Sequence, residues 1–169
     1  MKTLEDQMSI YAAYHQDARN KATHFFGVPM IIVSLFIPLA WLRFDLGPFV
    51  VTGAILFAAA ILIYYVFLDA PLALATAVFT ALFLLAAAWI ARQGAAFGWT
   101  AFGVLFVGGW IVQLVGHKFE GRKPALADNL FQIFIAPIFL CAELFFALGY
   151  KPKLHAAVQE RALRLRAGA

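Results

Sequence analysis

The sequence predicts an all-α integral membrane protein: a bundle of four transmembrane helices, a re-entrant or fifth hydrophobic helix, and an interfacial amphipathic helix at each end. Two observations lead to this fold class. Apolar residues make up 64% of the chain and aromatic residues 16%, whereas only 13% are charged, about half the share in a soluble domain. In addition, 18 of the 22 charged residues lie in the first 24 and last 52 positions. This balance excludes intrinsic disorder and argues against a water-soluble globule.

The chain length of 169 residues fits one domain, which we assign to residues 1–169 as a single multi-pass membrane domain. The first 24 residues are polar and charged, so they do not have the pattern of a signal peptide. Cys141 is the single cysteine and lies in an apolar stretch. It therefore cannot form an intramolecular disulfide, and it is typical of a small buried hydrophobic residue.

Four long stretches without Asp, Glu, Lys or Arg alternate with short polar connections. About 20 apolar residues, each rising about 1.5 Å, cross the hydrocarbon core, and every stretch is long enough. The connections contain Gly, Pro and charged residues typical of turns, so successive helices should be antiparallel neighbours. We expect transmembrane helices at about 28–42, 49–68, 71–91 and 99–117.

Both ends of the chain show the periodicity of amphipathic helices. In the expected N-terminal helix, about residues 1–22, apolar side chains recur at helical spacing. The tail, residues 151–169, has a similar apolar face beside cations that can reach lipid headgroups. We therefore expect both ends to lie on the cytoplasmic membrane surface. The two faces consist of Leu4, Met8, Tyr11 and His15, and of Leu154, Val158, Ala162 and Leu165.

A fifth apolar segment at about 130–149 is interrupted by Pro137 and Glu143, and charge counting favours a re-entrant path for it. With a cytoplasmic N-terminus, a spanning fifth segment leaves six Lys and Arg inside and seven outside, against the positive-inside rule. A re-entrant or in-plane segment gives eleven inside and two outside. We therefore expect both termini to lie on the cytoplasmic side. The membrane would be the inner membrane of a bacterium or the endoplasmic reticulum of a eukaryote. This topology explains the basic charge without a nucleic-acid partner.

Four histidines carry the main functional signal: His15, His24, His117 and His155. Four antiparallel spans bring the start of the first helix and the end of the last to the same membrane surface, so all four histidines should lie on one side. On a straight helix, His15 and His24 would point in opposite directions. A bend near residues 17–20 is therefore needed if both bind one ion.

The end of the fourth span presents polar groups on one helix face. Gln113, His117 and Glu120 follow i, i+4, i+7 spacing, and Gly116 lowers the steric barrier beside them. Imidazoles and a carboxylate that converge on a cavity suit iron, zinc or manganese, and two histidines with one carboxylate suit non-haem Fe(II). In the alternative interpretation, each histidine lies at headgroup level and hydrogen-bonds locally. The sequence lacks H-E-x-x-H, the helix motif of zinc proteases.

Charged residues flank this site. Glu143 lies inside an apolar segment, where a carboxylate is costly and indicates function. We expect it to bind metal, to pair with Arg122 or a histidine, or to face a water-filled re-entrant cavity. Lys118, Arg122 and Lys123 follow the fourth span, where cations serve topology and contact lipid headgroups.

Four segments resemble the signature of the Mpo1-like family, formerly a domain of unknown function: Tyr14-His15, Asn20 to Pro29, Gly109 to Glu120, and Lys123 to Leu130. The resemblance extends from about residue 8 to about residue 154. It implies an Fe(II)-dependent dioxygenase that uses dioxygen to shorten 2-hydroxy fatty acids by one carbon through α-oxidation. The acyl chain would then lie between the apolar helices, and one of the cations Lys118, Arg122 and Lys123 would pair with the substrate carboxylate instead of serving topology alone.

The same resemblance implies roles for individual residues. It makes His15, His24 and His117 the catalytic and metal-binding residues, whereas His155 has no family counterpart and is either a further ligand or part of the tail helix. Residues with supporting or substrate-binding roles follow from the motif positions and the flanking charges. They are Asn20, Gln113, Glu120, Arg122, Lys123, Asp128, Asn129 and Glu143.

Two other classes of function stay open. A membrane binding or transport protein would gate a solute with polar residues, but the expected spans contain few of them and no paired inverted breaks. A structural or adaptor protein would bind partners through its cytoplasmic ends, and its activity would not depend on the histidines.

Overall fold

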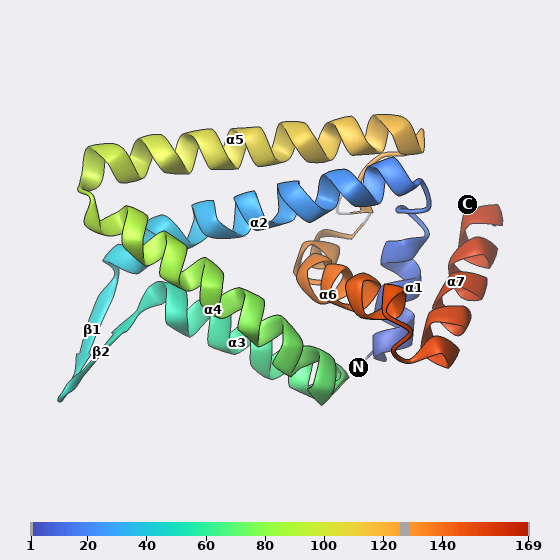
Figure 1. Ribbon diagram of the computed structural model, residues 1–169, viewed down its shortest axis with the longest axis horizontal. Coiled ribbons are helices and arrows are strands. Elements are labelled where there is room, and N and C mark those ends of the chain that lie inside the picture. The colour runs from blue at the N-terminus through green and yellow to red at the C-terminus, as the bar shows by residue number, and fades with distance from the viewer. Residues whose placement is uncertain (1, 126–128, 169) are drawn as a thin grey trace.

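A computed structural model describes residues 2–125 and 129–168, so the expected site residue Asp128 lies outside the described residues. Within these ranges the chain forms seven α-helices, an antiparallel β-hairpin and the 3₁₀-helix η2 (Figure 1). The α-helices are α1 (Leu4–Ala12), α2 (Ala18–Trp41), α3 (Gly53–Leu68), α4 (Ala70–Arg92), α5 (Ala95–Glu120), α6 (Ala136–Ala147) and α7 (Pro152–Ala167). The strands are β1 (Arg43–Leu46) and β2 (Phe49–Thr52), and η2 covers Leu130–Phe134.

The expected helical membrane architecture is confirmed in its main features. α2, α4 and α5 are apolar and have 24, 23 and 26 residues, long enough to cross a membrane. The segments expected at 71–91 and 99–117 lie within α4 and α5. α3 and α6 are apolar but shorter, with 16 and 12 residues.

The prediction that a helix begins at residue 49 is wrong, because residues 43–52 form a β-hairpin. The residues after Phe49 are β-branched, which favours a strand, and they pair with β1. Gly47 closes the turn with a φ of +64°, a left-handed conformation that glycine adopts without strain. The side chain of Thr52 then caps α3, which starts four residues later than expected.

The interfacial helix expected at residues 1–22 is also interrupted: α1 ends and α2 begins on either side of a turn at residues 13–17. The bend expected near residues 17–20 therefore lies slightly earlier. The carboxylate of Asp17 caps α2 by accepting the backbone N–H of Arg19 at 2.8 Å. Hydrogen bonds from the side chain and backbone of Arg19 lower the pKa of Asp17 to about 2, which keeps this cap charged.

The first apolar helix starts earlier than the expected range of 28–42. Because α2 begins at Ala18, Pro29 lies inside the helix and not in its first turn, where we expected it. A proline removes one backbone hydrogen bond, and packed neighbouring helices make such a loss tolerable. The longer helix places Asn20 and His24 on α2 itself.

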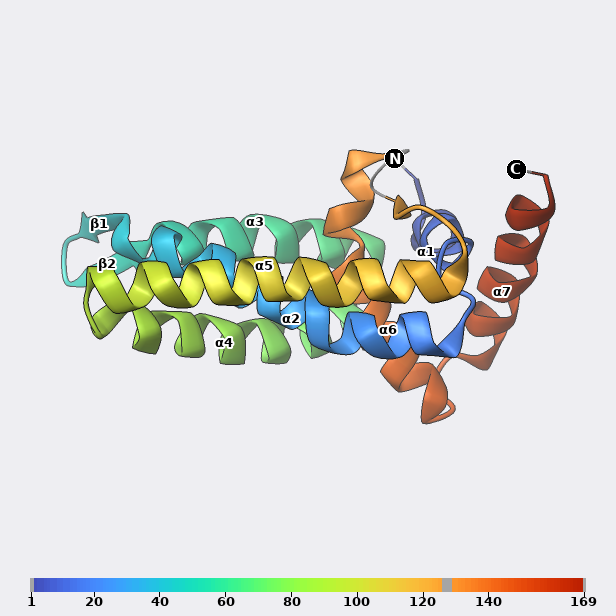
Figure 2. The same ribbon diagram turned by 90° about the horizontal axis from the view of Figure 1, so that it is seen from above.

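α2 and α5 lie side by side along most of their length (Figures 1 and 2). Glycine permits this close approach. A Cβ on Gly109 would lie 2.8 Å from Ile31 Cγ1 and 3.0 Å from the carbonyl oxygen of Gly27. The two helix backbones therefore touch, as they do in membrane helix pairs with small residues at the interface.

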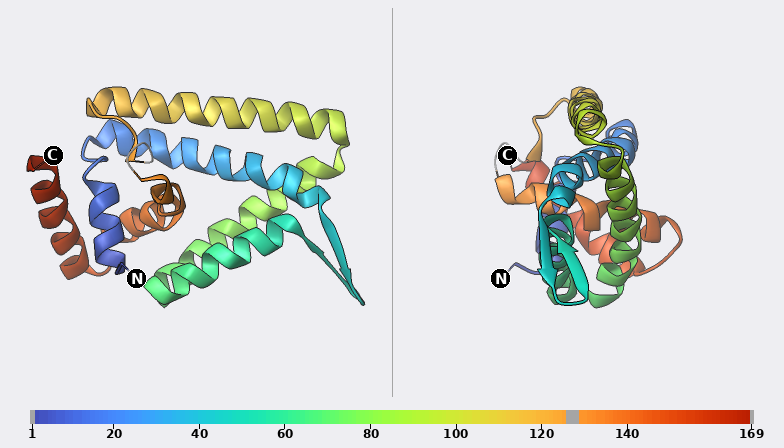
Figure 3. Two further views of the ribbon diagram at one scale, coloured as in Figure 1. Left: turned by 180° about the vertical axis from the view of Figure 1, so that it is seen from behind. Right: turned by 90° about the vertical axis from the view of Figure 1, so that its left-hand side faces the viewer.

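α3 and α4 form a second pair, which diverges from the first. Asp69 separates the two helices and caps α4 by accepting the backbone N–H of Leu72 at 3.0 Å. Near the β-hairpin, Trp41 Nε1 donates to the carbonyl oxygen of Ala91 at 3.2 Å, so the C-terminal ends of α2 and α4 lie together. From there the two pairs spread apart toward the end of the molecule that holds α1, α6 and α7 (Figures 1 and 3).

The helices at the two chain ends pack against protein. Tyr11 of α1 contacts Phe139 of α6 with ring centroids 4.6 Å apart, and α7 buries Val158 in the same core. Arg161 of α7 pairs with Asp6 of α1 at 2.5 Å. The apolar faces that we expected to rest on the membrane surface are thus largely covered by one another, because each supplies the apolar partner that the other needs.

The fifth apolar segment is too short to cross the membrane as one helix. Its helix α6 has 12 residues and a length of about 18 Å, against roughly 30 Å for the hydrocarbon core. Pro137 lies in the first turn of α6, where proline is tolerated, so it neither kinks nor breaks a longer helix. Tyr65 of α3 donates to the carbonyl oxygen of Phe134 at 2.5 Å and joins the preceding η2 to the second helix pair.

Replacing Gly109 tests the close contact between α2 and α5. Gly109→Ala should lower the free energy of unfolding by about 1–3 kcal/mol, because the new Cβ meets the α2 backbone. Gly103→Ala is the matched control on the same helix, since no atom lies within 4 Å of its Cβ. It should be neutral or stabilising by up to about 1 kcal/mol through helix propensity. Thermal unfolding in detergent measures both variants, and equal midpoints would contradict the contact.

Candidate metal centre

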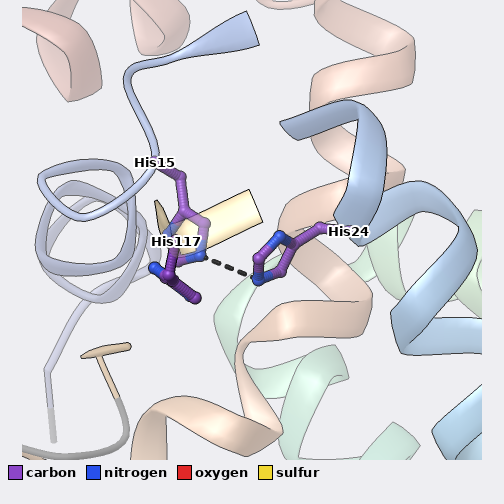
Figure 4. A group of neighbouring side chains, drawn as sticks. All are labelled: His15, His24 and His117. Carbon is purple, nitrogen blue, oxygen red and sulfur yellow. Dashed lines mark hydrogen bonds between the residues drawn. The ribbon is translucent and has the colours of Figure 1, made fainter. Parts of the chain in front are cut away.

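Three of the four histidines meet at the end of the molecule where the two helix pairs diverge. His15 comes from the turn between α1 and α2, His24 from α2 and His117 from α5 (Figure 4). One ring nitrogen of each lies within 4.8 Å of the others, and none of the three residues is more than 5% exposed. His155 does not join them: it lies on α7 and stacks on Phe146, with ring centroids 4.7 Å apart.

The hydrogen bonds of His15 and His24 assign their tautomers. His15 Nδ1 donates to the carbonyl oxygen of Tyr11 at 2.7 Å, and His24 Nδ1 donates to that of Asn20 at 2.9 Å. A carbonyl oxygen only accepts, so each Nδ1 carries the proton and each Nε2 carries a lone pair. The two Nε2 atoms face each other at 3.1 Å (Figure 4).

Two facing lone pairs repel each other unless a cation lies between or beside them. Backbone carbonyls that accept the other ring N–H are also the usual partners of metal-bound histidines. Burial, and secondarily the repulsion that a protonated His24 would exert, holds the pKa of His15 well below its usual value. A neutral imidazole is the form that binds metals, so these two residues fit a metal ion.

His117 completes the group from the opposite helix. Its ring centroid lies 5.0 Å from those of both His15 and His24. Its Nδ1 is buried and has no hydrogen-bond partner among the described residues. A buried polar atom without a partner is costly, and a bound ion or ligand at this site would remove that cost. The buried group of His15, His24 and His117 therefore suits a metal ion.

Gly116 brings α5 close enough for this arrangement. A Cβ at this position would lie 2.0 Å from Thr23 Oγ1 and 2.6 Å from Asn20 Oδ1, both on α2. Only glycine fits such an approach without displacing the side chains of Thr23 and Asn20. The expectation that Gly116 lowers the steric barrier beside the site is thus confirmed.

Glu120 lies on the same helix face as His117 but outside the histidine group. Its Oε2 accepts the backbone N–H of Asp17 at 2.8 Å and Asn20 Nδ2 at 3.1 Å. Its Oε1 forms an ion pair with Arg166 of α7. The carboxylate therefore holds the turn that connects two of the three histidines.

The other residues singled out in the sequence have separate positions. Gln113 lines the cavity described below, and Asn129 caps η2 by accepting the backbone N–H of Phe131 at 3.0 Å. Arg122 donates to the carbonyl oxygen of Arg166 at 3.1 Å, and Lys123 is exposed just after α5. Glu143 pairs with Lys21 at 2.7 Å, instead of with Arg122 or a histidine.

A cavity of about 660 Å³ extends from the histidines between the diverging helix pairs. Its lining reaches along α5 from His117 to Trp99, which is about 27 Å at the helical rise. Apart from the histidines, the lining is almost entirely apolar and includes Ile31 and Leu35 of α2 and Ile61 of α3. Its volume falls in the range of about 300–1,000 Å³ that is typical of small-molecule sites.

Sequence reasoning missed several contributors to this centre. The carbonyl oxygens of Tyr11 and Asn20 orient two rings, but every residue carries a carbonyl, so no sequence signal marks them. Arg166 is 46 positions from Glu120 and lies in a tail whose cations fit a membrane topology equally well. The pair between Lys21 and Glu143 did leave a signal, namely an isolated carboxylate in an apolar segment that needs a cation.

Comparison with known proteins agrees with the sequence motifs. A family model described as "2-hydroxy-palmitic acid dioxygenase Mpo1-like" matches residues 1–148. The chain is 35% identical over 158 residues to the 2-hydroxy-palmitic acid dioxygenase MPO1 of Saccharomyces cerevisiae. The aligned segment covers 92% of this chain and 87% of the yeast protein. No solved structure matches the chain. The resemblance expected from the motifs is confirmed: the chain belongs to the Mpo1-like family.

Proposed function

We propose that this protein is an Fe(II)-dependent dioxygenase that shortens 2-hydroxy fatty acids by one carbon through α-oxidation. One observation carries the proposal: the Nε2 atoms of His15 and His24 face each other at 3.1 Å inside a buried group of three histidines. Membership of the Mpo1-like family supports the reaction and the substrate, since the yeast relative is a 2-hydroxy-palmitic acid dioxygenase.

In this proposal His15, His24 and His117 hold Fe(II) through neutral imidazoles. The ion, when bound, supplies open positions for dioxygen and for the carboxylate and 2-hydroxyl of the substrate. The backbone carbonyls that accept from Nδ1 of His15 and His24 fix the direction of both rings. Asn20 and Glu120 hold the polypeptide between these rings in place.

The apolar cavity is our proposed site for the acyl chain. It begins at the histidines, so a carboxylate bound there would extend its chain between the helix pairs. Each methylene buried from water contributes about 0.8 kcal/mol, and less when the substrate arrives from the bilayer. We assign the polar end of the substrate to a position beside Gln113. This residue lines the cavity one helical turn from His117. Lys123, which is exposed just after α5, is our proposed guide for the substrate carboxylate. Asp128 and Asn129 stay proposed supporting residues from the family motif.

We also propose that four helices cross the membrane. The C-terminal ends of α2 and α4 lie together near the β-hairpin, so these two helices run in the same direction. The chain must return between them, and α3 is the helix available for that crossing. α6 shares a core with α1 and α7 (Figure 1), and the ring centroid of its Phe139 lies 6.0 Å from that of His15. This position supports a re-entrant fifth segment.

The positive-inside rule then places both termini and the histidines on the cytoplasmic side. The single membrane domain of residues 1–169 would lie in a bacterial inner membrane or in the endoplasmic reticulum, depending on the source organism.

The reaction itself provides the first test. Purified protein, loaded with Fe(II) without oxygen and then given dioxygen and 2-hydroxy-palmitic acid, should form the saturated acid that is one carbon shorter. His24→Ala should abolish product formation and weaken iron binding by more than the roughly 100-fold loss that supporting residues cause. His155→Ala is the matched control and should retain both properties, because His155 lies outside the histidine group. Equal product from His24→Ala and the unmodified protein would contradict the proposal.

Blocking the cavity tests the site assigned to the acyl chain. Ile61 lines the cavity, whereas Ile63, on the same helix, is 59% exposed and faces outward. Ile61→Trp should lower kcat/KM for 2-hydroxy-palmitic acid about 10- to 100-fold, since overpacking costs about 1–3 kcal/mol. A short-chain 2-hydroxy acid should be affected less. Ile63→Trp should leave both values unchanged, and equal effects of the two substitutions would rule out the cavity as the acyl-chain site.

A further inference from the structure

The C-terminal helix α7 contacts the polypeptide next to the candidate metal centre, at the end of α5 and in the turn before α2. It packs along α1, and its last turn comes near the end of α5 (Figures 1 and 2). Arg166 of this turn pairs with Glu120, and its carbonyl oxygen accepts Arg122 of the α5 end at 3.1 Å. Nearer the start of α7, Gln159 Oε1 accepts Gln16 Nε2 at 3.2 Å. The family model matches residues 1–148, so α7 lies beyond the matched segment.

Glu120 depends on this cation. Its side chain is 0% exposed, whereas that of Arg166 is 31% exposed. A buried carboxylate that loses its ion-pair partner keeps its desolvation cost without compensation. The Glu120 carboxylate would then turn toward water or another cation, and this change would weaken the bonds that it accepts on Oε2.

Those bonds lead directly to the two histidines of the turn. Asp17, whose N–H binds Glu120, is two residues from His15 and caps α2. Asn20, whose side chain binds the same oxygen, provides the carbonyl that accepts His24 Nδ1 at 2.9 Å. One carboxylate thus connects α7 to the backbone that sets the positions of both rings.

We propose that Arg166 is a positioning residue for the metal centre: by holding Glu120, the C-terminal helix keeps the turn at residues 13–17 and the start of α2 in the geometry that binds the metal. This inference rests on the proposed function for its effect on iron, but the ordering of the turn is a property of the polypeptide alone. Arg166 touches neither metal nor substrate, and it acts through Glu120.

Three variants of the full-length protein test the proposal. Arg166→Ala removes the cation, and Arg166→Lys keeps a positive charge. Arg164→Ala is the matched control, because Arg164 lies on the same helix turn and pairs with Glu160 at 3.0 Å, where both side chains are 69% exposed. Two properties are measured in detergent: the dissociation constant for Fe(II) without oxygen, and hydrogen exchange of the backbone amides at residues 13–20.

Arg166→Ala should raise the dissociation constant for Fe(II) about 10- to 100-fold, the usual cost of losing a group that supports a ligand. The same variant should speed hydrogen exchange at the Asp17 amide, whose acceptor is Glu120. Arg166→Lys should restore part of both properties. Arg164→Ala should match the unmodified protein in both.

Unchanged exchange at residues 13–20 in Arg166→Ala would overturn the proposal, whatever the iron affinity. Faster exchange spread over all of α1 and α7, with normal iron affinity in the folded protein, would also overturn it, since Arg166 would then only stabilise the fold. If the unmodified protein binds no iron, the proposed function fails, and hydrogen exchange at Asp17 still decides whether Arg166 orders the turn.

Discussion

The structure is organised around two imidazole nitrogens that face each other without a proton between them. Backbone carbonyls take the Nδ1 protons of His15 and His24, so their Nε2 lone pairs point at one another at 3.1 Å. Without a cation the two lone pairs repel each other, so packing of the surrounding polypeptide must keep the two rings in place. Burial adds to the constraint, because it keeps the pKa of His15 low and thus prevents protonation from relieving the repulsion.

Several unrelated parts of the chain maintain that constraint. Gly116 lets α5 approach α2, so that His117 reaches the other two rings. Glu120 holds the turn between His15 and His24 from the opposite helix, and Arg166 holds Glu120 from the tail. The divergence of the two helix pairs leaves an apolar cavity that begins at the same point. A buried histidine group that suits a metal ion and an apolar cavity together match the polar and apolar halves of a hydroxylated fatty acid.

The sequence predicted those features that depend on composition and on chain direction. Charge-free runs located α4 and α5 within a few residues, because exclusion of charge from the hydrocarbon core is a strong signal. Antiparallel order brought His24 and His117 together, since both lie at the same end of adjacent helices. Features that depend on a partner could not be predicted. Residues 43–52 form a strand pair, although residues 49–52 continue an apolar run that also suits a helix. α7 packs on α1, although its apolar face alone also suits a membrane surface. Likewise, the helical spacing in the sequence placed Glu120 on the same helix face as His117. It could not identify the partners of Glu120 on other elements, which are Asp17, Asn20 and Arg166.

X-ray absorption at the iron edge tests the central claim most directly, because it reports the ligands of the ion in the intact protein. The unmodified protein, loaded with Fe(II) without oxygen, should show multiple scattering from three imidazole rings, one each from His15, His24 and His117. His117→Ala should show two rings. A spectrum that contains only oxygen ligands, or the same number of imidazoles in both proteins, would contradict a metal centre built from these three histidines.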